Sequence, residues 1–482
     1  MAKDLRQFLD ILERKYPDEM VRISRPVDPA RFEVTALLQH LEHAGKFPLL
    51  LFENPLNLHG RPAGFALASN VFALRQRCAM ALDLDPANWR LPLSLEYARR
   101  ESELIEPEVV TGGEAPVKEV VARGEAVDLQ ALPIVRHHEM DPAPYIDMAV
   151  AMRDPEGGFY NTAFLRNMYQ GPRRLGVHMS PRHNWQIFRK YEGHDSPTPC
   201  AIIVSHHPAF YLGVLNVSPF GVNDYARIST IMGEPLRLVS SETWGEDFLV
   251  PADAEMVIEG EVLPKVREVE APFGEFTGYY GPQRLRPVIE VTAITHRRGA
   301  ILQHIFVGHR DNRVLGGIPK EGSLFNAIRG VVPTVQAVHF PLSGCCRFNC
   351  YISIDKKVDG ETKQAALVAL GACDFVKNVI VVDADIDVFN EEEVLWAVAT
   401  RVQADRDVDI IKDVKGNTLD PSQTDEIMTA KMIIDATKPA RRPYAARLRV
   451  PEAAMQAMEP RAFIPEEVWQ RLGTSGGVGQ GA

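Results

Sequence analysis

Apolar residues in the first hundred positions follow two patterns. In residues 5–12, leucine and phenylalanine recur at helical spacing with charged residues between them, which predicts an amphipathic helix. Residues 48–52 form a continuous apolar run that is typical of a short buried strand, and residues 72–84 predict a helix. The charged stretch 99–116 carries two adjacent glycines and predicts a linker.

From about residue 117 to residue 306 the pattern changes to short apolar runs separated by Gly, Pro and Asp. Many short strands with close turn signals predict a β-rich domain, either a barrel or a split sheet. The runs expected to form strands are 146–152, 201–205, 210–215, 256–258, 288–294 and 301–306.

From residue 324 onward, helical and strand patterns alternate, as in an α/β domain. Residues 362–372 and 394–402 predict helices, and residues 376–382 predict a buried strand. The fold class is therefore expected to be α/β (α+β), with a β-rich central domain. The expected divisions are an N-terminal α/β domain (1–115), the central domain (116–322), a C-terminal α/β domain (323–440) and a tail (441–482) whose last residues, 473–482, should be disordered.

Composition excludes several classes of protein. The chain has 482 residues, 45% of them hydrophobic and 24% charged, as in ordinary globular proteins. Its 53 Lys+Arg against 64 Asp+Glu leave no basic excess for a nucleic acid. No apolar run is long enough for a transmembrane helix, and the charged start is unlike a signal peptide. Six scattered cysteines favour reduced thiols and a cytoplasmic protein.

Some motifs suggest chemistry that their spacing does not support. Cys345, Cys346 and Cys350 lie near His339, but their spacing matches no zinc-ligand pair, so buried small side chains are the better interpretation. The stretch 316–320, Gly-Gly-Ile-Pro-Lys, could hold an anion but is more typical of a turn. Neither a Walker A motif nor a G-x-S-x-G elbow is present.

Glu270 and Glu275 are a candidate pair of catalytic carboxyls. In a straight strand, side chains five apart would face opposite sides, but Pro272 and Gly274 permit a bend that could bring both into one pocket. Paired carboxyls push their proton affinities apart, which suits a general acid. By itself, the segment favours the simpler interpretation, that both are solvated loop acids.

Asn161, His183 and Asp224 offer an amide oxygen, an imidazole nitrogen and a carboxylate. This mixed set suits Mg²⁺ or Mn²⁺ bridging to a phosphate. Their wide spacing in the sequence leaves scattered polar residues as the simpler interpretation.

Ordered motifs over residues 5–438 nevertheless resemble those of the UbiD family of reversible decarboxylases, which use prenylated FMN. Each motif is weak alone, and the set is specific. The matching segments are 132–133, 141–146, 161–166, 180–183, 223–225, 250–260, 270–280, 383–387, 396–401 and 431–437.

The resemblance implies an Arg/Glu/Glu catalytic set at Arg166, Glu270 and Glu275, with Glu275 as the proton donor. Arg166 and Glu270 would form an ion pair that orients the reacting carboxylate. A departing CO₂ must be replaced by a proton, so a nearby acid is chemically required. The flavin would act as the electron sink.

The resemblance also implies that the flavin phosphate is held through a divalent metal, Mn²⁺ or Mg²⁺, with K⁺ as a possible companion. The metal ligands would be Asn161, His183 and Asp224, and Asp224 stands where the family usually has Glu. Other expected cofactor contacts are Arg166, Arg182, Lys431 and the backbone of Leu215 and Asn216. The central domain would be a split β-barrel that binds the flavin.

The expected activity is decarboxylation of an aromatic, heteroaromatic or α,β-unsaturated acid, with CO₂ as product. The alternatives are an ATP-independent carboxylase and a non-catalytic scaffold subunit of a multi-component carboxylase. Expected partners are a flavin prenyltransferase that supplies the cofactor and a second copy of the chain, in a homodimer or a hexamer of dimers. The resemblance implies that the C-terminal domain, residues 323–440, mediates dimerisation. His206, His207, His309, Arg310 and Arg313 could read a second polar group on the substrate.

Overall fold

The computed structural model describes residues 2–423 and 428–472, and the expectation for residues 473–482 lies outside these. The first amphipathic segment forms α1, whose four apolar positions are buried and whose N-terminus is capped by the Asp4 carboxylate accepting from the Gln7 amide at 2.8 Å. The N-terminal helices are α1 (Leu5–Lys15), α2 (Glu33–His43), α3 (Arg75–Ala81) and α4 (Leu91–Glu101).

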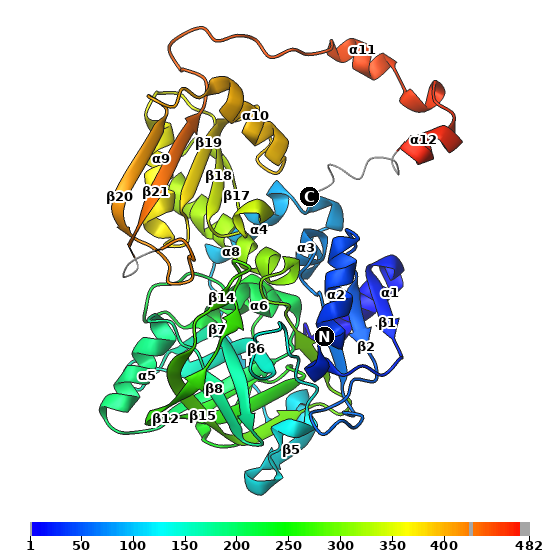
Figure 1. Cartoon of the computed structure of the whole chain (residues 1–482), viewed down its shortest axis with the longest axis vertical. Helices are drawn as coiled ribbons and strands as arrows, with labels where there is room; N and C mark the ends of the chain where they lie inside the picture. Colours follow the sequence, from blue (N-terminus) through cyan, green and yellow to red (C-terminus); the bar gives the residue numbers. More distant parts are fainter. Residues whose placement is uncertain (1, 424–427, 473–482) are drawn as a thin grey trace.

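The N-terminal domain also contains a four-stranded sheet, and one of its strands comes from a segment that is distant in the sequence (Figure 1). The run 301–306, expected in the central domain, forms β16 and pairs in parallel with β3. The order in this sheet is β1 (Met20–Ile23), β2 (Leu49–Phe52), β3 (Ala66–Ser69) and β16 (Ile301–His304).

The central domain is a closed antiparallel barrel, in agreement with the β-rich prediction. Pairing of β12 with β15 closes the sheet, and β5 (Val120–Arg123) adds to β15 outside the ring. Around the barrel the strands are β12 (Met256–Glu270), β9 (Thr198–Val204), β6 (Tyr145–Arg153), β7 (Tyr160–Gly171), β8 (Arg174–Val177) and β15 (Arg284–His296).

Smaller elements surround the barrel. The stretch 99–116 contains the end of α4 and the short strand β4 (Glu108–Val109), which pairs with β10. The remaining strands are β10 (Arg237–Ser241), β11 (Gly245–Pro251), β13 (Phe273–Gly274) and β14 (Tyr280–Gly281). The helices are α5 (His183–Gly193), α6 (Pro208–Val214) and α7 (Asp224–Met232).

The prediction of a strand at residues 210–215 is wrong, because this run forms the helix α6. Every residue of α6 is buried, so the segment is apolar on all sides and its periodicity cannot distinguish a helix from a buried strand. Pro208 occupies the first turn, and the ring of His207 accepts from the Ala209 amide at 3.2 Å.

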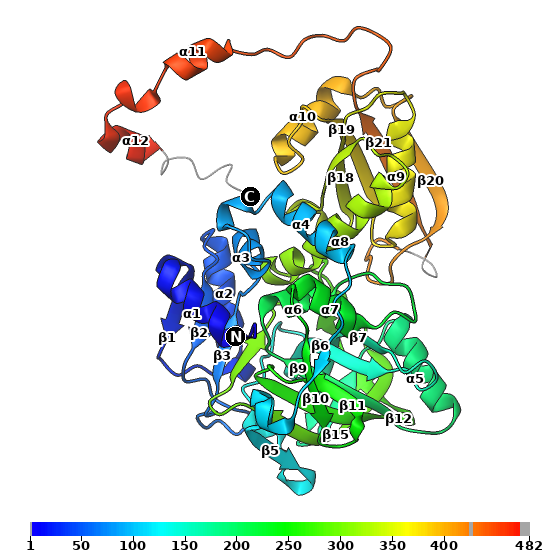
Figure 2. The same cartoon turned by 180° about the vertical axis from the view of Figure 1, so that it is seen from behind.

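The long helix α8 (Arg310–Arg329) leads from the barrel into the C-terminal domain (Figure 2). The stretch 316–320, expected to be a turn, lies inside this helix. A Cβ at Gly316 would be 1.5 Å from the guanidinium of Arg347, so glycine here serves close packing and not a turn.

The C-terminal domain is a mixed sheet flanked by α9 (Glu361–Ala372) and α10 (Glu391–Arg401), close to the predicted elements. Cys346 and Cys350 lie in its apolar core, whereas Cys345 is partly exposed. The sheet order is β17 (Val335–His339), β18 (Asn349–Ile354), β19 (Asn378–Asp383), β21 (Met428–Ala436) and β20 (Val408–Lys415).

Residues 439–472 form an extended arm that carries α11 (Glu452–Ala457) and α12 (Glu466–Leu472) (Figures 1 and 2). Its first part contacts the C-terminal domain, where the Tyr444 hydroxyl donates to the Thr400 carbonyl at 2.6 Å and Arg447 donates to the Asp385 carbonyl at 2.9 Å, and the rest leaves the body of the molecule. Phe463 is 66% exposed and Trp469 is 36% exposed. Within residues 2–423 and 428–472, no helix is both long and apolar enough to cross a membrane.

Candidate active site

The three residues expected to be catalytic lie together in the barrel. Arg166 projects from β7, and its Nη2 donates to Glu270 Oε2 at 3.0 Å while its Nε lies 2.9 Å from Glu270 Oε1. Its Nη1 donates to Glu275 Oε1. One guanidinium therefore binds both carboxyls, which supports their convergence over the alternative of two solvated loop acids.

The backbone between the two glutamates makes this convergence possible. β12 ends at Glu270, and Ala271 has a φ of +73°, in the left-handed region that reverses the chain direction. The chain then forms β13, which pairs with β14. A Cβ at Gly274 would be 2.5 Å from the ring of His138, so any larger residue there would require this ring to move.

Both carboxyl side chains are largely shielded from solvent. The side chain of Glu270 is fully buried and that of Glu275 is 13% exposed. Burial raises the pKa of Glu275 to about 7, against the lowering effect of Arg166. Glu275 can thus carry a proton near neutral pH and still stand beside a cation.

The expected metal ligands are only partly brought together. Asn161 Oδ1 lies 3.1 Å from His183 Nδ1. Asp224, the first residue of α7, accepts from the backbone amide of Thr162 at 2.6 Å and from its hydroxyl at 3.2 Å. Among the described residues, no group of three or more His, Cys, Asp or Glu side chains could hold a metal ion.

The other expected cofactor residues line the boundary between barrel and C-terminal domain or lie near α4. Arg182 forms an ion pair with Asp374 at 2.6 Å. Lys431 is buried, its Nζ donates to the Leu370 carbonyl at 3.1 Å, and burial lowers its pKa. Asn216, next to Leu215, donates to Glu101 Oε1 at 2.7 Å.

Two residues that sequence reasoning missed lie beside the catalytic cluster. His178 Nδ1 is 3.9 Å from Glu270 Oε2, and burial lowers its pKa to about 2, so the ring is neutral. Asp147 stands directly opposite Arg166 in the β6–β7 ladder. The signal for Asp147 was an acid within the apolar run 146–152.

The residues expected to recognise a second polar group of the substrate lie in different parts of the structure. His206 and His207 are buried, and His207 packs edge-on against Phe8 of α1. His309 binds Glu42 at 2.6 Å, and Arg310 Nε donates to the Ala73 carbonyl. Arg313 Nε donates to the Phe276 carbonyl at 3.1 Å, beside Glu275.

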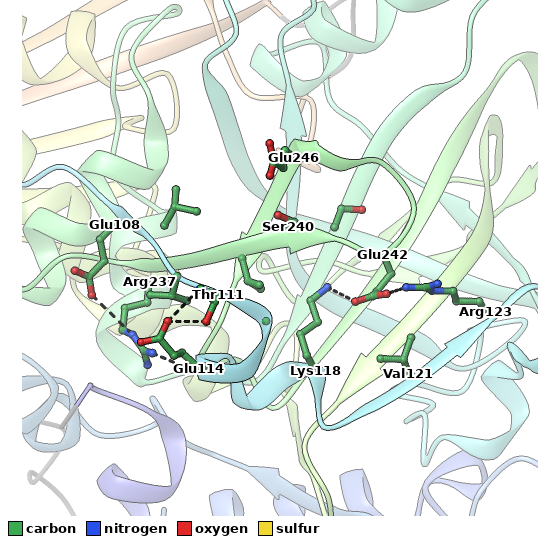
Figure 3. A pocket seen from close by; sticks show the side chains of 15 residues that line it. Glu108, Thr111, Glu114, Lys118, Val121, Arg123, Arg237, Ser240, Glu242 and Glu246 are labelled. Atoms are coloured by element: carbon green, nitrogen blue, oxygen red, sulfur yellow. Dashed lines mark hydrogen bonds and ion pairs between the residues drawn. The ribbon is translucent and has the colours of Figure 1, made fainter.

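A large open groove lies elsewhere, between β4, β5, β10 and β11 (Figure 3). Its volume is about 1040 Å³, and its charges pair with one another, as in the contact of Lys118 with Glu242 at 3.0 Å. None of the predicted site residues lines this groove.

Comparisons with known proteins identify the family of this chain. Residues 10–89, 108–310 and 313–436 match the N-terminal, Rift-related and C-terminal domains of 3-octaprenyl-4-hydroxybenzoate carboxy-lyase (UbiD). A phenolic acid decarboxylase from Sedimentibacter hydroxybenzoicus is 31% identical over 91% of this chain and 92% of its own length. An anhydromevalonate phosphate decarboxylase from Methanothermobacter thermautotrophicus is 36% identical over 66% of this chain and 74% of its own length.

Solved structures give the same result. The UbiD-class enzyme HmfF from Pelotomaculum thermopropionicum, in complex with FMN, superposes with a TM-score of 0.86 and 39% identity over 96% of this chain and 100% of its own. An evolved dimeric form of HmfF, in complex with prFMN, has a TM-score of 0.83 and 37% identity over the same shares. The chain belongs to the UbiD family of carboxy-lyases.

Proposed function

We propose that this protein removes CO₂ from an aromatic, heteroaromatic or α,β-unsaturated carboxylic acid with the help of prenylated FMN. The observation that carries this proposal is the guanidinium of Arg166 shared by Glu270 and Glu275 inside the barrel. The relative from Sedimentibacter is a phenolic acid decarboxylase, which favours an aromatic substrate.

Arg166 and Glu270 are proposed to orient the reacting carboxylate. The side chain of Glu270 is fully buried, so a buried cation such as Arg166 is needed beside its carboxylate. The contacts between the two side chains fix the orientation of the Arg166 guanidinium. The same guanidinium can attract an anionic substrate to the face where Glu275 stands. Holding substrate and acid at one cation lowers the entropic cost of their encounter.

Glu275 is proposed to supply the proton that replaces CO₂. The raised pKa keeps a fraction of this carboxyl protonated near pH 7, and its position next to Arg166 stabilises the carboxylate that remains after proton transfer. A carboxyl with an ordinary pKa would be ionised at this pH and could not serve as the acid.

The residues present fit the cofactor that the family implies. Asn161 and His183 already place an amide oxygen and an imidazole nitrogen 3.1 Å apart, and Asp224 adds a carboxylate that accepts from the amide of Thr162, the residue after Asn161. These would hold Mn²⁺ or Mg²⁺, with K⁺ as a possible companion, against the flavin phosphate. Lys431 and Arg182 would add positive charge there, and Leu215 and Asn216 backbone contacts. The flavin, supplied by a prenyltransferase, would act as an electron sink in this non-oxidative reaction.

The same site can serve an ATP-independent carboxylase, because the reverse reaction uses CO₂ and the decarboxylated product as its substrates. A non-catalytic scaffold is the third possibility, and the intact Arg166, Glu270 and Glu275 set argues against it. Flavin absorbance bands in protein co-produced with a flavin prenyltransferase would favour an enzyme, and their absence would favour the scaffold.

The proposal is tested by screening aromatic, heteroaromatic and α,β-unsaturated acids for CO₂ release by the holoenzyme. Glu275→Gln should reduce the rate for the best acid by about a thousandfold, since the amide keeps the shape but has no acidic proton. Wild-type turnover in this variant would remove Glu275 as the acid. Glu268→Gln, at an exposed glutamate of β12, the strand that ends at Glu270, is the control that should stay active.

A further inference from the structure

The segment that carries Glu275 turns back on itself and places Gly281 beside the carboxyl of this residue. β13 and β14 pair antiparallel, and in the turn between them the Glu275 amide donates to the Tyr279 carbonyl at 2.9 Å. A Cβ at Gly281 would be 3.0 Å from Glu275 Oε1 and 3.2 Å from Arg166 Nη1. A side chain at position 281 would therefore press on the contact between Glu275 and Arg166.

The turn itself does not require glycine at position 281. The φ of Gly278, +82°, lies in the left-handed region, whereas that of Gly281 lies outside it, so a residue with a side chain could adopt the backbone conformation there. Gly281 is buried. What glycine provides at this position is a close approach of the β14 backbone to the two charged side chains.

The backbone of Glu275 is packed on another side, so the carboxyl end is the part that can respond to a side chain at position 281. A Cβ at Gly308 would be 2.8 Å from the Glu275 carbonyl oxygen. Moving the carboxyl would change its distances to the titratable groups that face it. These groups come from four strands of the barrel and are Asp147 of β6, Arg166 of β7, Glu270 of β12 and Arg286 of β15.

We propose that Gly281 is a positioning residue, which by having no side chain sets the separation between the Glu275 carboxyl and the Arg166 guanidinium. This deepens the proposed function and rests on the role of Glu275 as the acid. A methyl group at position 281 would require the carboxyl to shift by a few tenths of an ångström. Because a misplacement of about 1 Å can slow a reaction about a hundredfold, this shift is large enough to lower the rate of proton transfer.

Kinetics of the holoenzyme, with the acid that gives the fastest CO₂ release in the screen, test this role. Gly281→Ala should lower kcat about tenfold and leave KM within about twofold, because the displaced acid acts in the chemical step. Since Arg166 lowers the pKa of Glu275, a carboxyl displaced from Arg166 should keep its proton to higher pH, and the fall of kcat at high pH should move up by about half a pH unit. Gly171→Ala in β7 is the matched control, since its Cβ would have Arg174 Cβ as its nearest neighbour at 3.8 Å, and it should leave kcat, KM and the pH profile unchanged.

Infrared titration of the holoenzyme adds a measurement that needs no turnover. The protonated carboxyl band that Glu275→Gln removes should titrate at higher pH in Gly281→Ala than in the unaltered protein or in Gly171→Ala. An unchanged titration midpoint would overturn the proposal, even beside a lower kcat, because a general disturbance of the fold would then explain the loss. If the unaltered holoenzyme released no CO₂ from any acid in the screen, the proposed function would fail, and the infrared midpoint would still decide the role of Gly281.

A second substitution tests the contact through stability. Glu275→Asp withdraws the carboxyl by one methylene and makes room for a side chain at position 281. Gly281→Ala should therefore lower the urea unfolding midpoint less in a Glu275→Asp background than in the unaltered chain. An equal loss in both backgrounds would contradict the contact between position 281 and the Glu275 carboxyl, and with it the proposal.

Discussion

At the scale of single residues, the decisive feature is one cation between two buried carboxyls. Arg166 can balance only one negative charge, and it makes two contacts with Glu270 and one with Glu275. The second carboxyl is therefore the one for which ionisation is costly, and the pKa of Glu275 is accordingly raised. The proposed roles, Glu270 as the main partner of Arg166 and Glu275 as the acid, follow from this difference in the number of contacts.

The pH dependence of turnover should report this carboxyl. The acid must be protonated, and burial raises its pKa to about 7, so kcat should be constant below that value and fall about tenfold per pH unit above it. We expect this in a pH profile of CO₂ release under saturating substrate. A rate that stays constant to about pH 9 would mean that another group donates the proton.

Removing the cation should also destabilise the protein. Arg166→Met leaves Glu270 buried and unpaired, so the free energy of unfolding should fall by about 3–5 kcal/mol in urea titrations at pH 8. The loss should shrink at low pH, where the carboxyls take up protons.

The control is an exposed pair near the end of the barrel, Arg174 and Glu268, whose side chains are both 38% exposed. Arg174→Met should cost only about 0–1 kcal/mol because solvent screens this contact. Equal losses in the two variants would show that burial of the Arg166 cluster does not determine its stability.

At the scale of elements, amphipathic helices and short buried strands were predictable from the sequence, whereas a fully buried helix was not. The helix over residues 5–12 was confirmed because its polar face reveals the period. The run 210–215 was mistaken for a strand because α6 has no polar face. A strand was predicted over residues 301–306 and forms over 301–304, but its pairing with β3 was not predicted, because long-range pairing leaves no local pattern.

The same limit applies to the site. The bend at residues 271–274 was predictable from Pro272 and Gly274, whereas the choice of Arg166 as the shared cation came from family resemblance. No local rule joins a residue of β7 to the end of β12. Asp147 was missed because an acid in an apolar strand is informative only once its neighbour across the ladder is known.

Helix α8 gives a test of packing against intrinsic helix propensity. Gly316→Ala would normally stabilise a helix by about 1 kcal/mol, but the new Cβ would be 1.5 Å from the Arg347 guanidinium. We expect a net destabilisation of about 1–3 kcal/mol in thermal or urea unfolding. Gly371→Ala in α9, with no atom within 4 Å of its Cβ, should instead be neutral or stabilising. Stabilisation by Gly316→Ala would contradict the packing explanation.

At the scale of the whole molecule, a few contacts connect domains that are distant in sequence. Arg182 at the start of α5 reaches Asp374 in the C-terminal domain, and β16 ties the barrel to the N-terminal sheet. The segment that carries Glu275 is part of this arrangement, because the neighbouring Phe276 packs edge-on against Phe348 and Phe375. A movement of the C-terminal domain would therefore change the packing next to Glu275.

The arm beyond residue 438 leads to a prediction about assembly. Leu448 is 97% exposed, and several further apolar side chains of the arm are exposed, which is unfavourable for an isolated chain. We expect the arm to pack on a second copy. Sedimentation should show a dimer or larger assembly, and a chain ending at residue 440 should form smaller species.

A point substitution makes the same test without removing the arm. Burying one leucine contributes about 2 kcal/mol, so Leu448→Asp should weaken self-association by about thirtyfold or more per contact. Leu104→Asp is the control, because Leu104 is 60% exposed and lies between α4 and β4, outside the arm. The unaltered chain sedimenting as a monomer, or Leu448→Asp matching the control, would exclude the arm from assembly. Because Leu448 is far from Arg166 in the sequence and outside the barrel, its loss should leave the flavin spectrum of the holoenzyme unchanged, and this separates assembly from cofactor binding.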